Sequence, residues 1–232
     1  MADAVGWTYR KDWFAKPELR AEFNQKYGRE LEPPKTWDEL LEVAKFFTEP
    51  PGLTNAYVQE GLDAFKSGQM AMQMNWFAFF PGLYKDQNVG GDKIGFFVNP
   101  AGPKGQFSQL GGQGISVVSY SDKKDDALKY IRWFAQPAVQ QKWWELGGYS
   151  AAKSVVQAPG FPASQPFAPA FLTTMGFMKD FWAEPLYVDL LLDMQKRVHD
   201  YVVADKGTAQ EALDQLVKDW KKVFADEGKQ TN

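Results

Sequence analysis

The stretch Gly68-Gln-Met-Ala-Met-Gln-Met-Asn-Trp-Phe-Ala-Phe-Phe-Pro81 joins a helix end, a strand and an aromatic run. A short helix is expected just before it, over Gln59–Lys66, and Gly68 is placed to close that helix. From Met70 to Asn75, methionine alternates with Ala, Gln and Asn, and this period of two predicts a strand. The aromatic residues Trp76–Phe80 therefore follow at the C-terminal end of that strand.

Helices and strands alternate on both sides of this stretch. Thr36-Trp-Asp-Glu39 is a capping box, in which side chains satisfy N–H groups at a helix start, and it predicts a helix over 37–47. A second capping box, Thr208-Ala-Gln-Glu211, predicts the last helix. Other expected elements are a helix from the cap Asp122 to about Ala135, helices Ala138–Leu146 and Leu186–Val203, strands Lys93–Val98 and Gly114–Ser119, and a linker or crossing loop over 157–169. The alternation indicates an α/β protein.

Composition excludes several classes of function. The 232 residues suffice for one large domain or two small ones, and the chain has no cysteine and one histidine, so a disulfide scaffold and a cysteine-bound metal are excluded. The net charge of −3 argues against a nucleic-acid partner. The sequence has no apolar run of membrane-spanning length, and its first residues lack the pattern of a secretory signal. We expect no cofactor and no metal.

The aromatic run has two interpretations. Aromatic content is 16%, and four large rings in the five positions 76–80 do not all fit one interior because successive strand residues point in opposite directions. Trp76 either packs in the core or lines a small-molecule site. A flat ring suits the apolar face of a sugar, whose hydroxyl groups would then need polar neighbours such as Asn75 and Gln113.

Gly111-Gly112-Gln113-Gly114 precedes the expected strand, whereas a dinucleotide fingerprint follows one. The glycines form either a tight turn or a place where a ligand approaches backbone amides closely. Catalytic constellations built on a nucleophile and a base lack parts, because His199 is the single histidine and cysteine is missing. A glycosidase needs only two carboxylates, so residue type leaves a carbohydrate-active enzyme open. Its candidate carboxylates are Glu145, Glu184 and Asp189.

Several motifs together resemble one family. They are Pro34-Lys-Thr-Trp-Asp-Glu-Leu40, Ala64-Phe-Lys-Ser-Gly-Gln-Met-Ala-Met72 with Asn75-Trp76, Gly111-Gly112, Ala127 to Pro137, and Gln140. In this order they resemble the extracellular solute-binding proteins of family 1, the sugar-binding components of ABC importers. The resemblance implies a periplasmic-binding-protein type II-like, helix-rich α/β fold with two lobes. It also implies a non-catalytic protein, periplasmic or extracellular, with a carbohydrate ligand and the membrane subunits of an ABC transporter as partners.

The resemblance carries over to individual residues of this chain. It points to Trp76 as a ring that stacks on the ligand, with Asn75 beside it, and to a ligand-facing turn. It also points to residues near a hinge and cleft. The turn residues are Gly111, Gly112 and Gln113, and the hinge residues are Trp182, Glu184 and Tyr187.

The chain departs from the family pattern in length. Such proteins run to about twice this length, and a block that should follow the helix 37–47 is missing, which places a suspected deletion junction at Thr48–Glu49. We therefore expect an incomplete two-lobe architecture. In it, 1–92 and 150–232 are segments of the second-lobe type and 93–149 resembles part of the first lobe. The sequence is then either truncated and internally deleted or only part of a longer chain.

Two consequences follow if the deletion is real. The apolar faces of 93–149 lose their partner, so dimerisation or domain swapping is expected. The ligand cleft also loses a wall, so sugar affinity should be weak or absent. The alternatives to a carbohydrate-binding protein are a structural or engineered lobe without a ligand and, as a third reading, an enzyme that uses a carboxylate pair.

Overall fold

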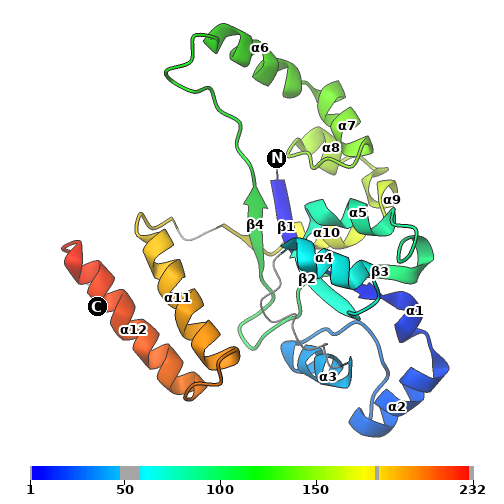
Figure 1. Cartoon of the computed structure of the whole chain (residues 1–232). Coiled ribbons are helices and arrows are strands. Elements are labelled where there is room, and N and C mark those ends of the chain that lie inside the picture. The colour runs from blue at the N-terminus through cyan, green and yellow to red at the C-terminus, as the bar shows by residue number, and fades with distance from the viewer. Residues whose placement is uncertain (1, 48–57, 181–182, 230–232) are drawn as a thin grey trace. The chain divides into compact units, whose positions relative to one another are not determined.

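The computed structural model describes residues 2–47, 58–180 and 183–229. The suspected junction at Thr48–Glu49 and the predicted site residue Trp182 both lie outside these residues. The chain divides into two compact units, Met1–Lys179 and Asp180–Asn232 (Figure 1).

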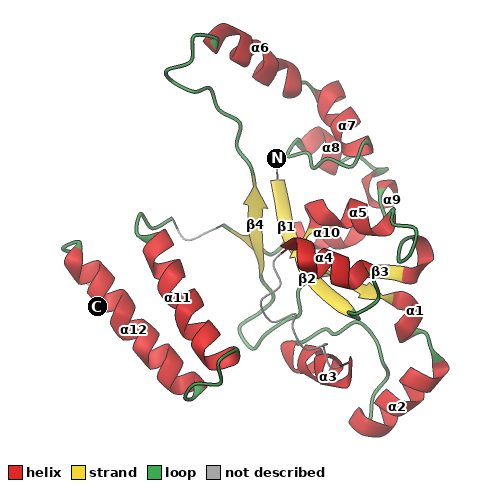
Figure 2. Ribbon diagram, viewed as in Figure 1, coloured by secondary structure: helices red, strands yellow, loops and turns green. Residues whose placement is uncertain are grey.

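The first unit is built on a five-stranded sheet in which β1 (Ala2–Arg10) is central. β1 pairs antiparallel with β2 (Met72–Trp76) along one edge, and with β3 (Ile94–Phe97) and β4 (Ser108–Gly112) along the other (Figure 2). β4 also pairs, in parallel, with the short strand β5 (Met178–Lys179). The strands predicted around Met72 and Phe96 are confirmed, whereas the sequence patterns gave no prediction for β1.

Both faces of β1 are covered. Successive strand residues point to opposite faces, and each face packs against a different hydrophobic core. A β-carbon added to Gly6 would lie 2.5 Å from the ring of Phe77, which belongs to the larger hydrophobic core. Trp7 and Tyr9 pack instead against a smaller core. The larger core includes side chains of α4 (Val58–Lys66), α5 (Phe80–Tyr84), α7 (Pro137–Glu145), α8 (Lys153–Val156), α9 (Phe161–Ser164) and α10 (Ala168–Met175), and the smaller core includes those of α1 (Lys11–Phe14), α2 (Pro17–Tyr27) and α3 (Trp37–Phe47).

Aromatic rings fill the larger core. Phe167 is fully buried, and its ring centroid lies 5.6 to 6.4 Å from those of six other aromatic residues. These are Phe77, Phe80, Tyr84, Phe96, Trp144 and Tyr149. Much of the aromatic content of the sequence is therefore structural.

The second unit is a pair of helices, α11 (Tyr187–Val202) and α12 (Ala209–Asp226). The Trp220 indole N–H donates to the Leu190 carbonyl at 2.8 Å, and Arg197 pairs with Asp219 at 2.6 Å, so polar contacts join the two helices. Both helices were predicted, and the capping box of Thr208 is present in full.

The first capping box forms in part. The helix predicted over 37–47 is confirmed as α3, and Thr36 Oγ1 accepts the Glu39 N–H at 3.2 Å. The Glu39 carboxylate, however, accepts the N–H of Lys35 at 2.6 Å, one residue before the Thr36 N–H that the motif predicts.

Three expectations about secondary structure are wrong. Gly114–Ser119 is not a strand, since no described residue pairs with it and a strand pattern without a neighbouring strand has no ladder to join. Asp122 does not cap the next helix, α6 (Lys124–Phe134), whose N-cap is Lys123 without a side-chain hydrogen bond. The segment 157–169 is not one open loop, because it contains α9 and the start of α10.

Among the described residues, the remaining short elements are the 3-10 helices η2 (Phe77–Phe79) and η3 (Gly91–Lys93). Within the described part of the chain, no helix combines the length and the apolar character needed to cross a membrane.

Phe167→Ala is expected to lower the free energy of unfolding by about 3–5 kcal/mol, because it leaves a cavity in the aromatic core. Phe107→Ala is the matched control, since the Phe107 side chain is 50% exposed and its loss should cost about 0.5 kcal/mol or less. Urea unfolding followed by circular dichroism measures both values. Equal losses in the two variants would contradict the core described above.

Candidate functional site

Trp76 and Gly111, which lie far apart in the sequence, meet across β1. In the sheet, Trp76 pairs with Val5 and Gly111 pairs with Asp3. These two β1 residues are two positions apart and share a face, so Trp76 and Gly111 are diagonal neighbours on that face. A β-carbon added to Gly111 would lie 2.1 Å from Cζ3 of Trp76. Only glycine therefore allows the indole to lie where it does.

The indole of Trp76 is half-buried. Part of the ring is covered by the backbone at Gly111, and part stays accessible from outside. The two interpretations of Trp76, core packing and a ligand-lining ring, therefore describe different parts of one side chain. Whether the accessible part binds a ligand stays a prediction.

Asn75 is buried and lies on the opposite face of β2 from Trp76, because the two are successive strand residues. Its Oδ1 accepts the backbone N–H of Trp76 at 2.8 Å. The side chain thus fixes the backbone where the strand ends and η2 begins. The predicted pair is adjacent in sequence but does not form one continuous side-chain surface.

Gly111 and Gly112 lie within β4, and not in a turn before a strand as the sequence predicts. Gly112 has a φ of 136°, a value that side-chain-bearing residues rarely adopt. The Ser108 hydroxyl donates to the Val5 carbonyl at 2.7 Å and ties β4 to β1. Gln113 follows the strand with an exposed side chain, so the three residues of the predicted ligand-facing turn lie together at the end of β4.

Asp3 is the residue that the sequence analysis missed. It is 6% exposed, and its Oδ1 accepts the N–H groups of Ala4 at 2.8 Å and of Ala78 at 3.3 Å. Burial raises the pKa of its carboxyl group from 3.8 to about 6, against the smaller lowering effect of the two hydrogen bonds. The sequence contains a sign that Asp3 is buried, because Asp3 is flanked by the apolar residues Ala2, Ala4 and Val5. The sequence patterns did not, however, predict a strand there.

Tyr149 is a second buried polar residue, and it belongs to the larger core. Its hydroxyl donates to the carbonyl of Phe77 at 2.5 Å. Burial, with a further contribution from the charge of Asp3, raises the pKa of Tyr149 well above its ordinary value. Burial therefore disfavours the charged form of the Asp3 carboxyl group, and a hydrogen-bond donor or a cation beside it would favour that form.

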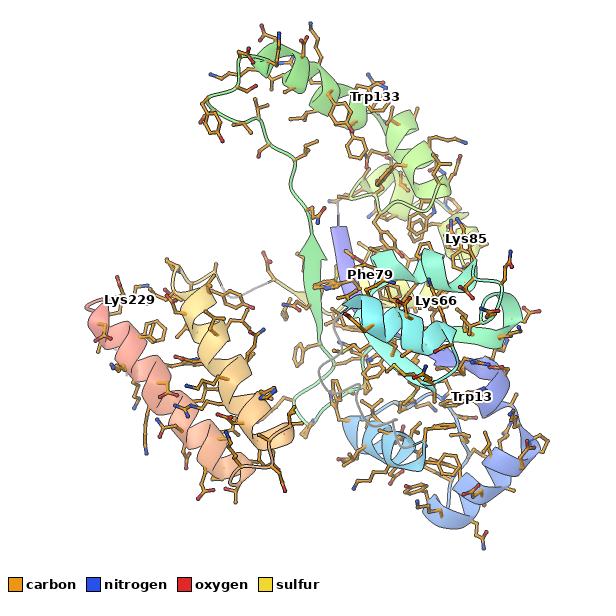
Figure 3. The ribbon with its side chains drawn as sticks, viewed as in Figure 1. Trp13, Lys66, Phe79, Lys85, Trp133 and Lys229 are labelled. Atoms are coloured by element: carbon orange, nitrogen blue, oxygen red, sulfur yellow. The ribbon has the colours of Figure 1, made fainter. Side chains whose placement is uncertain are left out.

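The two predicted hinge residues that the structure describes, Glu184 and Tyr187, lie in the second unit. Glu184 pairs with Lys229 (labelled in Figure 3) and accepts the N–H of Leu186 at 3.2 Å, and these hydrogen bonds lower the pKa of Glu184. Tyr187 is the first residue of α11. Glu184 thus connects the start of α11 to the residues after α12. The structure brings Trp76, Asn75, Gly111, Gly112 and Gln113 into the first unit and Glu184 and Tyr187 into the second.

Of the carboxylates considered for catalysis, Glu145 belongs to the first unit, and Glu184 and Asp189 belong to the second. Glu145, at the end of α7, pairs with Lys142 at 3.3 Å. Asp189 lies on α11 with His199, in the second unit. Among the described residues, no group of three or more His, Cys, Asp or Glu side chains could hold a metal ion.

Comparison with known proteins finds solute-binding proteins. A family model described as bacterial extracellular solute-binding protein matches residues 1–141. A probable amino-acid ABC transporter periplasmic-binding protein of Sinorhizobium fredii is 30% identical over 128 residues. That alignment covers 53% of this chain and 28% of the relative, so the match spans less than a third of the relative's length.

Solved structures share the fold at low sequence identity. Maltose-bound MalE3 of T. maritima superimposes with a TM-score of 0.76 at 21% identity, over 96% of this chain and 71% of that one. A solute-binding protein of Thermotoga lettingae with bound α-D-tagatose gives 0.73 at 18%, over 96% and 70%. The cyclic α-maltosyl-1,6-maltose binding protein of Arthrobacter globiformis gives 0.68 at 19%, over 97% and 71%.

Gly111→Ala is expected to displace the indole of Trp76 and to lower the free energy of unfolding by about 1–3 kcal/mol, as overpacking does. Gly114→Ala is the matched control, because no heavy atom lies within 4 Å of a β-carbon at that position. Thermal unfolding of the two variants measures the difference. A Gly111→Ala protein as stable as the control would contradict the contact between Trp76 and Gly111.

Asp3 predicts a pH dependence of stability. Since folding raises the pKa of Asp3 from 3.8 to about 6, the stability that its proton provides is complete below pH 3.8 and is lost as the pH rises through 6. Asp3→Asn stays neutral, so its free energy of unfolding relative to wild type should rise by about 2–3 kcal/mol between pH 4 and pH 7.5.

Urea unfolding at several pH values between 4 and 7.5 tests this expectation. Asp12→Asn is the control of opposite sign, because a hydrogen bond from Arg10 lowers the pKa of Asp12. That variant should lose stability near neutral pH and lose less of it in acid, below the ordinary pKa of an aspartate. Parallel pH profiles for wild type and Asp3→Asn would refute the raised pKa.

Proposed function

Because the chain belongs to the bacterial extracellular solute-binding protein family, we propose that it binds a carbohydrate, a sugar or an oligosaccharide, for delivery to an ABC transporter. Members of this family are extracellular or periplasmic binding proteins and not enzymes, which removes the carboxylate-pair enzyme from the alternatives. The predicted helix-rich α/β fold is confirmed by solved sugar-binding relatives, of which this chain covers about 70%.

One observation carries the proposal of a carbohydrate. The partly accessible indole of Trp76 lies against Gly111, and the β1 residue that pairs with Gly111 is Asp3, a buried carboxylate. An aromatic surface with a few fixed polar groups suits a sugar, which has apolar C–H faces and a rim of hydroxyl groups. The solved relatives with bound maltose and tagatose support this ligand class.

An amino acid is the second candidate ligand. It is favoured by the printed description of the Sinorhizobium relative as a probable amino-acid binding protein. In that case the carboxylate of Asp3 would pair with the ligand's ammonium group, and the accessible part of Trp76 would contact its side chain.

We propose the same two-lobe division that the sequence indicates. Segments 1–92 and 150–232 belong to the second-lobe type and 93–149 to the first lobe, with the suspected junction at 48/49. Coverage of about 70% of solved relatives supports an incomplete architecture. An incomplete cleft would bind weakly, and the limiting case is a structural or engineered lobe that binds no ligand.

The proposal includes the chain's surroundings. We place it in the periplasm or outside the cell, where the membrane subunits of an ABC transporter are its partners. We also propose that it self-associates, as a dimer or by domain swapping, because the predicted first-lobe segment carries exposed apolar side chains such as Trp133 and Tyr130.

Trp76→Ala is expected to weaken ligand binding by at least about tenfold, because it removes the stacking surface. Isothermal titration calorimetry with monosaccharides, disaccharides, oligosaccharides, polyols and amino acids measures the affinity and identifies the class. Trp133→Ala is the control, since this tryptophan is 49% exposed and lies on α6. Unchanged affinity in Trp76→Ala would remove Trp76 from the site, and no heat with any ligand would favour the non-binding lobe.

A further inference from the structure

We propose that Tyr149 is a positioning residue for the ring of Trp76, on which it acts through the peptide unit that joins Phe77 to Ala78. We call this unit the 77–78 peptide. The inference rests on the function proposed above, in which the accessible part of the Trp76 indole contacts the ligand. Tyr149 is itself 2% exposed, so it would influence binding without touching the ligand.

Trp76 stands where the pairing between β1 and β2 ends. It forms the terminal pair of that register, with Val5, and the next three residues are those of η2. Phe79, labelled in Figure 3, is the last residue of this turn. The backbone after Trp76 therefore needs hydrogen bonds from outside the β1–β2 ladder to keep one conformation.

The 77–78 peptide is held on both of its sides. The Phe77 carbonyl accepts the Tyr149 hydroxyl at 2.5 Å, and the Ala78 N–H donates to Oδ1 of Asp3 at 3.3 Å. The carbonyl and the N–H lie in one rigid plane and point in opposite directions, so the two hydrogen bonds together fix the orientation of that plane. The two side chains come from β1 and from the segment after α7, which are far apart in the sequence.

The larger core fixes Tyr149 in turn. The centroid of its ring lies 5.6 Å from those of Trp144 and Phe167 and 5.4 Å from that of Phe171. Phe171 belongs to α10, which lies beside β1 (Figure 1). Burial raises the pKa of Tyr149 well above its ordinary value, so the hydroxyl group keeps its proton near neutral pH and remains a donor. The Phe77 carbonyl thus has a donor at a defined place.

The orientation of the 77–78 peptide affects Trp76 because the side chains beside it have little room. The fully buried ring of Phe77 fills the space over Gly6, where an added β-carbon would lie 2.5 Å from it. The Trp76 indole lies against Gly111, and Oδ1 of Asn75 accepts the Trp76 N–H. If the peptide rotated, the backbone of Phe77 would turn with it. Either the Phe77 ring would then leave Gly6 or the indole would leave Gly111.

A fixed indole favours binding because less conformational freedom is lost when a ligand arrives. Ordering one side chain at a binding surface has a cost that corresponds to about three- to tenfold in affinity. Loss of the Tyr149 hydroxyl should therefore weaken binding by about this factor, although the stacking ring itself is still present.

Fluorine NMR tests the effect on the ring without any ligand. When the protein is labelled with 5-fluorotryptophan, each of its nine tryptophans carries one fluorine, and Trp76→Phe identifies the resonance of Trp76. We expect Tyr149→Phe, which keeps the aromatic ring, to shift or broaden that resonance. Tyr84→Phe is the matched control, because it removes a tyrosine hydroxyl that donates to Gln165 beside the same core. An unmoved Trp76 resonance in Tyr149→Phe, or an equal shift in both variants, would overturn the proposal.

Asp3 offers a second route to the same peptide. Asp3→Ala removes the acceptor of the Ala78 N–H, so it should also move the Trp76 resonance. Asp3→Asn keeps an acceptor oxygen at this position and should move the resonance less. Circular dichroism establishes that each variant is folded. A Trp76 resonance that stays in place in folded Asp3→Ala would contradict the role given to the 77–78 peptide.

Calorimetry with maltose, the ligand in the MalE3 structure, connects the ring to binding. We expect Tyr149→Phe to bind maltose about three- to tenfold more weakly than wild type and Tyr84→Phe to bind it equally well. Unchanged affinity in Tyr149→Phe despite a moved Trp76 resonance would reject the role in binding. Absence of maltose binding by wild type would count against the function proposed above, and the fluorine resonances would still decide whether Tyr149 positions the ring.

Discussion

The first unit depends on β1, which pairs with three strands and contacts two hydrophobic cores. β2 pairs with one edge of it, and β3 and β4 divide the other edge between them. One face of β1 leaves room at Gly6 for Phe77, and the other contributes Trp7 and Tyr9 to the smaller core. A single strand with this many constraints fixes the register of β2 against β4, and that register places Trp76 beside Gly111.

Two residues of the candidate site, Gly111 and Asp3, do not favour the stability of the fold. Glycine at position 111 removes a side chain that would otherwise pack on the sheet, and the indole of Trp76 occupies the freed space. Asp3 keeps a carboxyl group in surroundings where burial raises its pKa to about 6. A binding site needs such groups because a ligand that supplies hydrogen bonds or opposite charge gains the free energy that folding alone leaves unrealised.

Local signals in the sequence predicted local structure well. The capping residues Thr36 and Thr208 predicted the starts of α3 and α12, since a cap is decided by side chains within three residues. The sequence does carry a signal for β1, because Val5, Trp7 and Tyr9 alternate with Gly6, Thr8 and Arg10, but this signal covers only part of the strand and breaks at Ala4-Val5. Within the candidate site, Trp76 and Gly111 were predicted by residue type and resemblance. Asp3 was not, because its burial depends on β2 and β4, which lie far from it in the sequence.

The error at Gly114–Ser119 shows where sequence patterns stop being decisive. β4 and this segment are nearly contiguous and both carry strand-compatible residues, yet only β4 is a strand, because Ser108 and Gly111 find β1 as a neighbour. At Gly112 the backbone takes a φ of 136° and leaves the ladder. Local propensity therefore indicates that a segment is compatible with a strand. The strand forms only where a neighbouring strand has free backbone N–H and C=O groups to pair with.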